Sequence, residues 1–571
     1  MEGELYNLAK KYALHNALQH DGKASVKAVI GKIMAERRDL RGKIKSVMEI
    51  VERVVEEVND LSVDEQRRIL SEIEPKLLVK EKRRKEISLP PLPHAEHGKV
   101  VTRFPPEPNG YLHIGHAKAA FIDYEYARMY DGKFILRFDD TNPENEKIEY
   151  YDVQKEDLRW LGIEWDVEYC TSSKLPQHYE LAERLILQGD AYVCLCDRST
   201  IRKNRFEGKI CRCRERDKDE NLSLWREMHG EIEEGGAVLR LKGDMKSKNT
   251  AMRDPTLFRI IDAEHPIQGY KYRVWPTYDF AGAVEDSLSG VTHPFRTKEY
   301  ELRDEVYFYI LDKLNLRKPH LMEFSRLSIE GMPVSKRKIK PLIDEGKVSG
   351  YDDFRLPTLR GLRRRGITPE AIRIFVLSQG VSKSESVVTF DQLEAVNRKI
   401  IDKRARRFFF VPNPVKIYVE NAPHLKKKLK FHPTEEMGYR VVETSSVFFV
   451  PEEDMKNMKE GDIFRLKDLY NVRISEIKGG EIRATYAGEE LLKDVEKIQW
   501  VTEKSFDFVV LVGGPLFIGD KYNPDSLKKV KGLVEESLKT ARNGEIVQFE
   551  RFGFVRIERE RDSMVGIFTH K

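Results

Sequence analysis

Two short segments of the chain carry residues suited to phosphate chemistry. The first is His113-Ile-Gly-His116, which follows a Pro/Gly-rich turn and opens an Ala-rich helical stretch reaching Tyr126. A helix N-terminus offers unpaired N–H groups to an anion, and Gly115 lets a ligand approach the backbone closely. The second segment is Val334-Ser-Lys-Arg-Lys338, which comes just after an apolar run. Its lysines can bring positive charge to the same phosphates from the other side.

Either segment alone has a simpler interpretation. A lone histidine is most often a structural imidazole, and a short basic run is most often an ordinary solvated loop. Two histidines that flank Ile-Gly at the start of a helix, followed later in the chain by the basic segment, favour function instead. The sequence therefore predicts that both segments bind phosphate groups.

Four of the five cysteines form two close pairs, Cys194-x-Cys196 and Cys211-x-Cys213. Four thiolates can hold a zinc ion tetrahedrally, although the C-x-C spacing is shorter than the common C-x₂-C. The sequence leaves three alternatives open, namely a structural zinc site, disulfide bonds and free thiols. Cys170 stands alone, and we expect it to be inert.

Length and composition set limits on the class of protein. The 571 residues predict about three to five domains, and 40% hydrophobic with 34% charged residues is enough for packed cores with a highly charged surface. The net charge of +5 is small for so many charges, so a nucleic-acid partner would have to meet local basic patches. The sequence has no apolar stretch of about 18 residues, so we expect no membrane span, and no secretion leader is recognised at Met1. An odd number of cysteines without a leader predicts the reducing cytoplasm.

Residues 1–93 are predicted to form a separate helical domain. Apolar residues between Ile44 and Val58 recur with a helical period, and Ser62-Val-Asp-Glu65 has the spacing of a capping box for the next helix. The basic run Lys80–Lys85 is either a solvated helix end or a contact for an RNA backbone. Leu89-Pro-Pro-Leu-Pro93 then has the composition of a stiff linker.

The pattern of predicted helices and strands divides the rest of the chain into three regions. Short β-like runs alternate with helical ones over residues 94–348, which predicts a parallel α/β sheet, and residues 190–275 interrupt it as an insertion. A helical connecting region is predicted over residues 349–407. Residues 408–571 contain many short strands separated by turns, which predicts β-barrels.

Several longer strings make the resemblance to a known family specific. The first segment lies within Arg103-Phe-Pro-Pro-Glu-Pro-Asn-Gly-Tyr-Leu-His-Ile-Gly-His116, and further strings follow in order: Leu136-Arg-Phe-Asp-Asp-Thr-Asn-Pro-Glu-Asn145, Trp275-Pro-Thr-Tyr-Asp-Phe280, Gly290-Val-Thr-His293 and Glu323-Phe-Ser-Arg-Leu327. Together they resemble the signatures of class I aminoacyl-tRNA synthetases of the glutamyl/glutaminyl branch. The β-rich C-terminal region resembles the archaeal and eukaryotic glutamyl type, because bacterial glutamyl enzymes use helices there. The second signature departs from the commonest form at Pro333, Val334 and Arg337 but keeps Ser335-Lys336.

The resemblance implies a fold and an activity. We expect a Rossmann-like α/β catalytic domain, an N-terminal helical extension and C-terminal anticodon-binding β-barrels. We expect ATP-dependent activation of L-glutamate, assisted by Mg²⁺, and its transfer to tRNA(Glu). The expected catalytic residues, which stabilise transition-state charge, are His113, His116 and Lys336. The residues that the resemblance places around ATP are Glu107, Pro108, Asn109, His113, Gly115, His116, Thr297, Arg326, Leu327, Val334, Ser335 and Lys336.

The resemblance also implies an amino-acid pocket. Arg103, Asp139 and Tyr278 match the family's positions for contacts to the substrate. Arg296 stands where glutaminyl enzymes carry a small neutral residue. A guanidinium can hold a carboxylate bidentately, whereas a primary amide would face it with further donors, so Arg296 predicts glutamate rather than glutamine. The simpler interpretation of Arg296 is a surface arginine that pairs with Glu299.

Three alternative functions stay open on the sequence. They are a glutaminyl-tRNA synthetase, a glutamyl transferase acting on a modified tRNA base, and an inactive RNA-binding relative. Arg296 opposes the first, the β-rich C-terminal region opposes the second, and the intact signatures oppose the third. The sequence does not decide whether tRNA(Gln) is charged as well as tRNA(Glu). We expect a monomer.

Overall fold

The structure, a computed structural model, describes most of the chain: residues 2–19, 22–37, 44–74, 89–333, 335–384, 386–478, 481–560 and 563–571. The chain divides into two compact units, Met1–Ser88 and Leu89–Lys571. Each unit is described by itself below. In the described residues, no helix is both long and apolar enough to cross a membrane.

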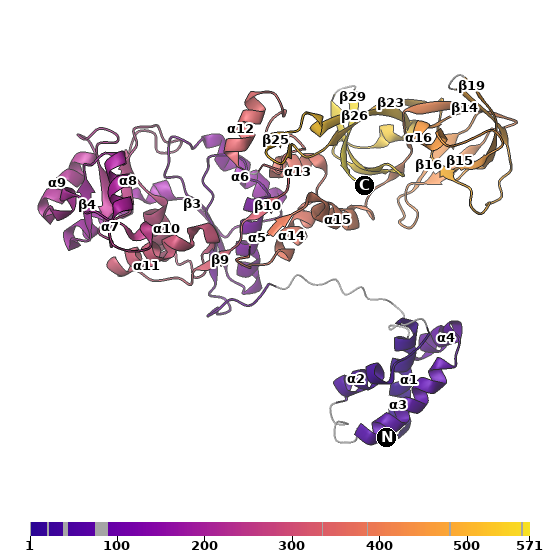
Figure 1. The fold of residues 1–571 in the computed structure, drawn as a ribbon, viewed down its shortest axis with the longest axis horizontal. Helices are drawn as coiled ribbons and strands as arrows, with labels where there is room; N and C mark the ends of the chain where they lie inside the picture. The colour runs from indigo at the N-terminus through magenta and orange to yellow at the C-terminus, as the bar shows by residue number, and fades with distance from the viewer. Residues whose placement is uncertain are drawn as a thin grey trace. The chain divides into compact units, whose positions relative to one another are not determined.

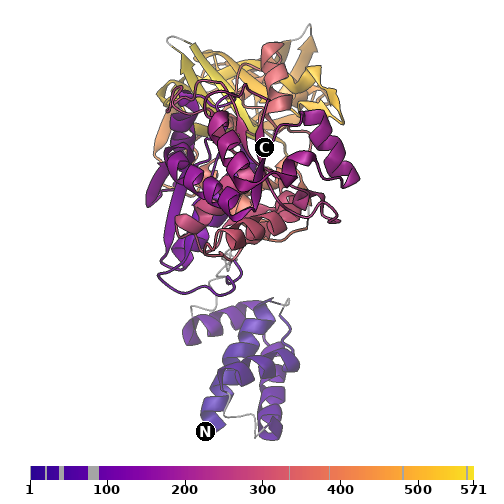
Figure 2. The same cartoon turned by 90° about the vertical axis from the view of Figure 1, so that its left-hand side faces the viewer.

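The described residues of unit 1 form four helices, α1 (Glu2–Gln19), α2 (Val26–Glu36), α3 (Ile44–Asn59) and α4 (Val63–Ile73) (Figure 2). The helical period predicted between Ile44 and Val58 is confirmed, since the buried valines of α3 face the core of the unit. The capping box is also confirmed, because the Ser62 hydroxyl accepts the Glu65 N–H while the Glu65 carboxylate accepts the Ser62 N–H. The basic run Lys80–Lys85 lies outside the described residues.

The segment predicted to be a linker packs on unit 2. Its backbone is satisfied there: the Tyr126 hydroxyl donates to the Pro90 carbonyl at 2.9 Å, and the Leu92 N–H donates to the Tyr130 hydroxyl at 2.9 Å. The Pro93 carbonyl lies 2.9 Å from Nε2 of His293. The described part of unit 2 therefore begins at Leu89, earlier than the predicted boundary at residue 93.

The N-terminal half of unit 2 is built on parallel strand pairs, as the α/β alternation predicted. β1 (Val101–Phe104), β2 (Lys133–Phe138) and β3 (Val167–Cys170) form one sheet, with α5 (Ile114–Met129) between β1 and β2 and α6 (Ile148–Trp160) between β2 and β3. β8 (Phe295–Thr297) pairs with β9 (Met322–Phe324), and β10 (Leu327–Ile329) pairs with β11 (Ser386–Val388). The Thr292 N–H donates to the Val101 carbonyl at 2.8 Å, which brings the segment before β8 beside β1.

The insertion forms an antiparallel four-stranded sheet of β4 (Ala191–Cys194), β5 (Val238–Leu241), β6 (Thr256–Ile260) and β7 (Val274–Pro276). α7 (Leu175–Gln188) leads into it, and α8 (Arg198–Glu207) and α9 (Lys218–Met228) lie between β4 and β5. β7 leads directly into α10 (Tyr278–Leu288), which is followed by α11 (Asp304–Lys313). The return from the insertion thus delivers α10 to the catalytic core.

α12 (Lys336–Asp344) precedes the connecting region, which holds α13 (Leu359–Arg365), α14 (Pro369–Ser378) and α15 (Phe390–Ile401) (Figure 1). β11 lies between α14 and α15 in the sequence. Two seven-stranded sheets follow, which confirms the β-rich C-terminal prediction. One sheet contains β12 (Arg407–Phe408), β13 (Phe410–Pro412), β23 (Ser505–Gly513), β26 (Leu527–Glu535), β27 (Ile546–Phe549), β28 (Gly553–Glu560) and β29 (Ser563–His570). The other contains β14 (Pro414–Glu420), β17 (Val447–Pro451), β18 (Ile463–Leu466), β19 (Asn471–Lys478), β20 (Glu481–Tyr486), β21 (Lys497–Ile498) and β22 (Val501–Thr502).

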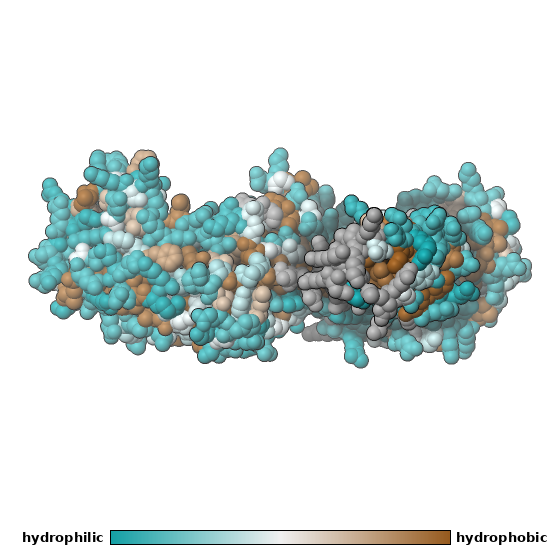
Figure 3. All heavy atoms as spheres, turned by 90° about the horizontal axis from the view of Figure 1, so that it is seen from below, coloured by the Kyte–Doolittle hydropathy of each residue, from teal (hydrophilic) through white to brown (hydrophobic). Residues whose placement is uncertain are grey.

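Two hairpins and a short helix complete the C-terminal region. They are β15 (Lys426–Lys430) with β16 (Tyr439–Glu443), β24 (Phe517–Ile518) with β25 (Lys521–Tyr522), and α16 (Glu452–Met455). Separate hydrophobic cores fill the two sheets, so they fold as two packed bodies. The face drawn in Figure 3 is largely hydrophilic, with hydrophobic residues in scattered patches, as is ordinary for a protein surface.

Candidate active site

The start of α5 is fixed by the two histidines of the first signature. His113 is the N-cap residue, and its Nδ1 accepts the Gly115 N–H at 3.1 Å. His116 reaches back, so that its Nδ1 accepts the His113 N–H at 3.2 Å. This is the reciprocal arrangement of a capping box, made here by two imidazoles. A Cβ at Gly115 would lie 2.9 Å from the His113 ring, so glycine is required for this close approach.

Both imidazoles are held neutral. Burial, with the nearby Arg326 charge, lowers the pKa of His116 to about 4, and burial and the His116 ring lower the pKa of His113 well below its usual value. Because each Nδ1 accepts a backbone N–H, the ring proton sits on Nε2. The rings are 3.8 Å apart between centroids and can present two N–H donors beside the N-terminus of α5. Neutral donors next to a helix N-terminus suit a phosphate.

The structure brings the second signature to the first. Lys336 is the first residue of α12, after Ser335 at its N-cap, and its Nζ donates to the Asn109 carbonyl at 2.5 Å. The ammonium also lies 5.7 Å from the centre of the Tyr150 ring. A Cβ at Gly110 would lie 3.9 Å from the Lys336 stem. Lys336 is exposed and reaches over the turn that leads to His113.

The other residues predicted around ATP lie on the flanks of this region. Pro108 accepts the Lys147 N–H through its carbonyl, and Asn109 donates its N–H to the Glu107 carbonyl at 2.9 Å. Arg326 lies exposed between β9 and β10, where it pairs with Glu299 at 3.1 Å. Thr297 ends β8, and Leu327 is buried at the start of β10. Val334 lies outside the described residues.

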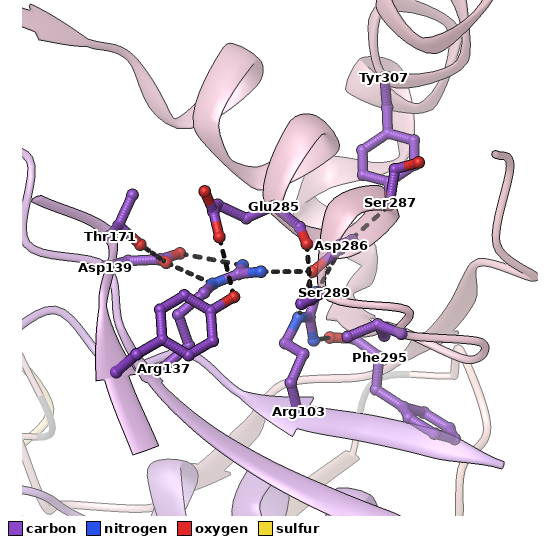
Figure 4. A network of polar contacts seen from close by, with 12 residues as sticks. Arg103, Arg137, Asp139, Thr171, Glu285, Asp286, Ser287, Ser289, Phe295 and Tyr307 are labelled. Atoms are coloured by element: carbon purple, nitrogen blue, oxygen red, sulfur yellow. Dashed lines mark hydrogen bonds and ion pairs between the residues drawn. The ribbon is translucent and has the colours of Figure 1, made fainter. Parts of the chain in front are cut away.

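Two residues of the predicted amino-acid pocket, Arg103 and Asp139, belong to a buried ion-pair network (Figure 4). Arg103 from β1 holds Asp286 from α10 bidentately, at 2.9 and 3.1 Å. Arg137 from β2 joins the same carboxylate at 2.8 Å and pairs with Asp139 at 2.7 Å. The Tyr307 hydroxyl donates to Asp286 at 3.0 Å. Two arginines and two aspartates therefore balance their charges in the core.

Within this network, both Arg103 and Asp139 are bonded to other protein groups. The Arg103 side chain is almost fully buried, and its remaining bond goes to the Phe295 carbonyl at 2.9 Å. Asp139 accepts Arg137 and the Thr171 hydroxyl, at 2.7 and 3.0 Å. Direct contact of these two side chains with substrate stays a prediction.

Asp286 and Arg137 were not among the site residues predicted from the sequence. Arg137 stands inside the string that carries Asp139, but an arginine in a strand gives no sign of its partner. Asp286 lies in an ordinary helical stretch of α10. Only the folded chain shows that the two meet.

Arg296 and Tyr278 lie together in a small hollow. Arg296 projects from β8 among three tyrosine rings, with its guanidinium carbon 5.7, 5.2 and 5.4 Å from the ring centres of Tyr278, Tyr300 and Tyr307. Tyr278, Arg296 and Tyr307 line the hollow, with Asp279, Gly282 and Arg303 as the other lining residues. Tyr307 thereby joins Arg296 to the Arg103–Asp286 network.

Arg296 is buried but weakly bonded. One terminal nitrogen donates to the Tyr300 carbonyl at 3.3 Å, and the other lies 3.7 Å from Asp304, beyond hydrogen-bonding distance. Within the described part of the chain, its buried Nε has no hydrogen-bond partner. The simpler interpretation, pairing of Arg296 with Glu299, is wrong, because Glu299 pairs with Arg326.

The four cysteines of the insertion converge, as a zinc site requires. Their sulfur atoms all lie within 4.8 Å of one another, and the closest pairs are Cys194–Cys211 at 3.8 Å and Cys196–Cys213 at 3.9 Å. A neighbour offers a donor to sulfur, because a guanidinium nitrogen of Arg240 lies 3.8 Å from Cys194. Hydrogen-bond donors around sulfur suit thiolates, so this residue set fits a metal ion. Cys170 lies apart from the cluster.

Comparisons with known proteins cover almost the entire chain. Residues 99–403 match the family described as "tRNA synthetases class I (E and Q), catalytic domain". Residues 405–487 and 497–558 match two families described as "tRNA synthetases class I (E and Q), anti-codon binding domain".

Three archaeal relatives are similar over nearly their full length, and each is named "Glutamate--tRNA ligase". That of Nitrosopumilus maritimus is 46% identical over 573 residues, covering 100% of both chains. That of Cenarchaeum symbiosum is 45% identical over 564 residues, covering 98% of this chain and 99% of the relative. That of Pyrococcus furiosus is 46% identical over 585 residues, covering 100% of both chains.

Proposed function

The chain belongs to the class I tRNA synthetases for glutamate and glutamine, and we propose that it is a glutamate–tRNA ligase. It activates L-glutamate with ATP and transfers the glutamyl group to the 3′ end of tRNA(Glu). We propose further that it works as a monomer in the cytoplasm. The alternative of an enzyme that glutamylates a modified tRNA base is disfavoured by the two C-terminal regions that match anticodon-binding families.

The observation that carries glutamate as the substrate is the state of Arg296. Within the described residues, this buried guanidinium leaves its Nε without a hydrogen bond and has Asp304 only at 3.7 Å, so it has donors to spare. The γ-carboxylate of glutamate would satisfy them bidentately, whereas the NH₂ group of glutamine would set donors against donors. Unpaired buried donors are costly, so one arginine can give strong discrimination without an editing step.

The chemistry of activation needs position and charge rather than a covalent enzyme nucleophile. An oxygen of the glutamate α-carboxylate attacks the α-phosphorus of ATP, a P–O bond forms, and the bond to pyrophosphate breaks. We assign the Nε2–H groups of His113 and His116 and the N-terminus of α5 to the ATP phosphates. Lys336 brings a full positive charge to the same region, where it stabilises the negative charge that develops on the leaving group.

Mg²⁺ would supply further neutralisation of the pyrophosphate when bound. Among the described residues, the four cysteines are the one group of three or more potential ligands that lie together, and thiolates do not suit Mg²⁺. We therefore propose that Mg²⁺ arrives with the ATP phosphates, as is usual for this ion. Zinc in the cysteine cluster would be structural, since four protein ligands leave no open position for catalysis.

The amino-acid end is assigned by the same reasoning. Tyr278 borders the hollow that contains Arg296, so it is proposed to contact the substrate directly. Asp139 is the proposed partner of the substrate ammonium, held in place by Arg137. Arg103 supports the pocket through Asp286 and Tyr307.

A charging experiment tests the function. Labelled glutamate and labelled glutamine are each offered with ATP to transcripts of tRNA(Glu) and tRNA(Gln), and charged tRNA is counted. We expect glutamyl-tRNA(Glu) and no glutaminyl product. The tRNA(Gln) reactions decide whether that tRNA is also a substrate. Charging of tRNA(Gln) with glutamine would establish the glutaminyl alternative, and failure to charge any tRNA would refute the ligase.

A further inference from the structure

Arg296 has an acidic neighbour that the proposed pocket does not use. Asp304, the first residue of α11, places Oδ1 3.7 Å from the Arg296 guanidinium. That oxygen is buried and, within the described residues, has no hydrogen-bond partner. The two charges are thus close enough to attract each other but too far apart to form the hydrogen bond that a relaxed Arg–Asp pair makes.

A second carboxylate lies on the other side of Asp304. Glu323 stands opposite Arg296 in the parallel pair of β8 and β9, where registered side chains share a face of the sheet. Its Oε1 is also buried without a hydrogen-bond partner in the part of the chain that the structure describes. Lys383 pairs with Glu323 and, at 2.9 Å, with Glu301. The two neighbouring carboxylates are therefore each paired with one cation, Asp304 with Arg296 and Glu323 with Lys383.

Two neighbouring carboxylates resist simultaneous ionisation. Burial raises the pKa of Asp304 to about 6, with Glu323 adding to the rise and Arg296 opposing it. A carboxyl group that tends to keep its proton is a poor partner for a guanidinium. Glu323 thus weakens the hold that Asp304 has on Arg296.

We propose that Asp304 is a positioning residue that sets the affinity for glutamate by acting through Arg296. Asp304 is an internal competitor for the guanidinium, and its 3.7 Å separation from Arg296 together with the neighbouring Glu323 carboxylate keeps this competitor weak enough for the substrate's γ-carboxylate to displace it. This inference rests on the proposed role of Arg296 in binding that carboxylate. It adds a means of tuning affinity without touching the substrate.

The Arg103–Asp286 pair of the same protein is fully hydrogen-bonded and contrasts with the loose Arg296–Asp304 pair. Asp286 holds Arg103 bidentately at 2.9 and 3.1 Å, with Tyr307 and Arg137 completing its hydrogen bonds. An arginine bonded in that way has little left for a ligand. Had Asp304 met Arg296 with equal geometry, the substrate carboxylate would have to break a fully formed buried pair, which is expensive.

The test compares two variants expected to act in opposite directions. Asp304→Asn keeps the shape but removes the competing charge, so the KM for glutamate should fall about two- to tenfold. At pH 6, close to the pKa of Asp304, Glu323→Gln removes the neighbour that suppresses ionisation of Asp304, so the KM for glutamate at that pH should rise by up to about twofold. The kcat and the KM for ATP should stay the same in both. The matched control is Asp312→Asn, an exposed residue of the same helix that pairs with Lys318.

Double variants show whether the effects pass through the proposed chain of residues. Asp304→Asn/Glu323→Gln should behave as Asp304→Asn, because Glu323 acts only by way of Asp304. In an Arg296→Cys background, Asp304→Asn should leave the KM for glutamate unaltered. The readout is steady-state charging of tRNA(Glu) with labelled glutamate, with thermal melting to verify that each variant is folded.

The outcomes separate this inference from the proposed function. An unchanged or raised KM for glutamate in folded Asp304→Asn overturns the inference, as does a Glu323→Gln variant whose KM falls. If Asp304→Asn does not fold, the direction in which Glu323→Gln changes the KM for glutamate still tests the inference. If the wild-type protein charges tRNA(Glu) with glutamate, the proposed function stands whatever the KM values of these variants. If it does not, the proposed function itself is refuted.

Discussion

The cysteine cluster of the insertion predicts one structural zinc ion per chain. Four sulfurs bound tetrahedrally at about 2.3 Å from zinc stand about 3.8 Å apart. The two shortest separations, 3.8 and 3.9 Å, match that edge, and the four atoms lie within 4.8 Å of one another. A disulfide would need sulfurs about 2.05 Å apart. The geometry therefore favours a metal over the two alternatives left open by the sequence.

The perturbation is the loss of one ligand, Cys211→Ser, with Cys170→Ser as the matched control outside the cluster. Protein is produced with zinc in the medium, purified without metal-affinity resin and measured by elemental analysis. Wild type and Cys170→Ser should each hold about one zinc per chain, and Cys211→Ser should hold clearly less. Since Cys194, Cys211 and Cys213 are buried around the metal position, the variant should also expose α8 to hydrogen exchange and proteolysis.

Counting thiols in denatured, unreduced protein separates the three alternatives further. Zinc and free thiols both give all five cysteines as thiols, whereas two disulfides would leave only Cys170 reactive. Five thiols with no bound metal would refute the zinc assignment in favour of free cysteines. One thiol would refute it in favour of disulfides.

The remaining predictions concern the catalytic and recognition residues. Lys336→Ala should fold normally but lose on the order of 10²–10³ in charging rate, because a charge aimed at the leaving phosphates is missing; wild-type turnover would contradict the assignment. Arg296→Cys should lower charging with glutamate roughly tenfold to more than a hundredfold, since a charged hydrogen-bonding partner is worth about 1.5–3 kcal/mol; an unchanged glutamate-to-glutamine ratio would reopen the glutaminyl alternative. Asp286→Asn should lower the free energy of unfolding by about 3–5 kcal/mol in urea titrations, because two buried arginines would keep only Asp139 as a carboxylate partner; a loss below about 1 kcal/mol would contradict a charge-balanced core. Base changes in the anticodon of tRNA(Glu) should reduce charging by weakening contacts with residues 405–558, each lost base stack costing about 1–3 kcal/mol; unaltered charging would argue against anticodon recognition there.

Local signals in the sequence predicted local structure well. The capping box of Ser62 and Glu65 was readable because its residues lie three positions apart and bond only to each other. The start of α5 was readable for the same reason, since a Pro/Gly turn and a glycine between two histidines act within a few residues. The many short strands separated by turns after Phe408 also sufficed to predict a strand-rich C-terminal region, which forms two seven-stranded sheets among the described residues.

Long-range juxtapositions were a different matter. The sequence predicted that the two signature segments serve the same phosphates, but nothing in periodicity or composition predicts that Lys336 reaches the carbonyl of Asn109. The proline-rich segment Leu89–Pro93 was predicted to be a linker, whereas it packs within unit 2. Proline content predicts stiffness, but it does not predict the partners that bond to the backbone. Asp286 gave no signal at all, since an aspartate in a helix is most often solvated.

The arginines show why residue type alone could not separate support from recognition. Arg103 and Arg296 were both predicted to contact glutamate, and both are buried. What divides them is the geometry of the nearest carboxylate: Arg103 has Asp286 in two short bonds, whereas Arg296 has Asp304 at 3.7 Å and a free Nε. A buried arginine whose bonds are complete holds the scaffold, and one whose bonds are incomplete can gain by binding an anion. Tyr307 connects the two arginines, because its hydroxyl donates to Asp286 and its ring packs against Arg296. The Arg103–Asp286 pair therefore holds the ring that borders the Arg296 guanidinium, which is the group still able to bind an anion.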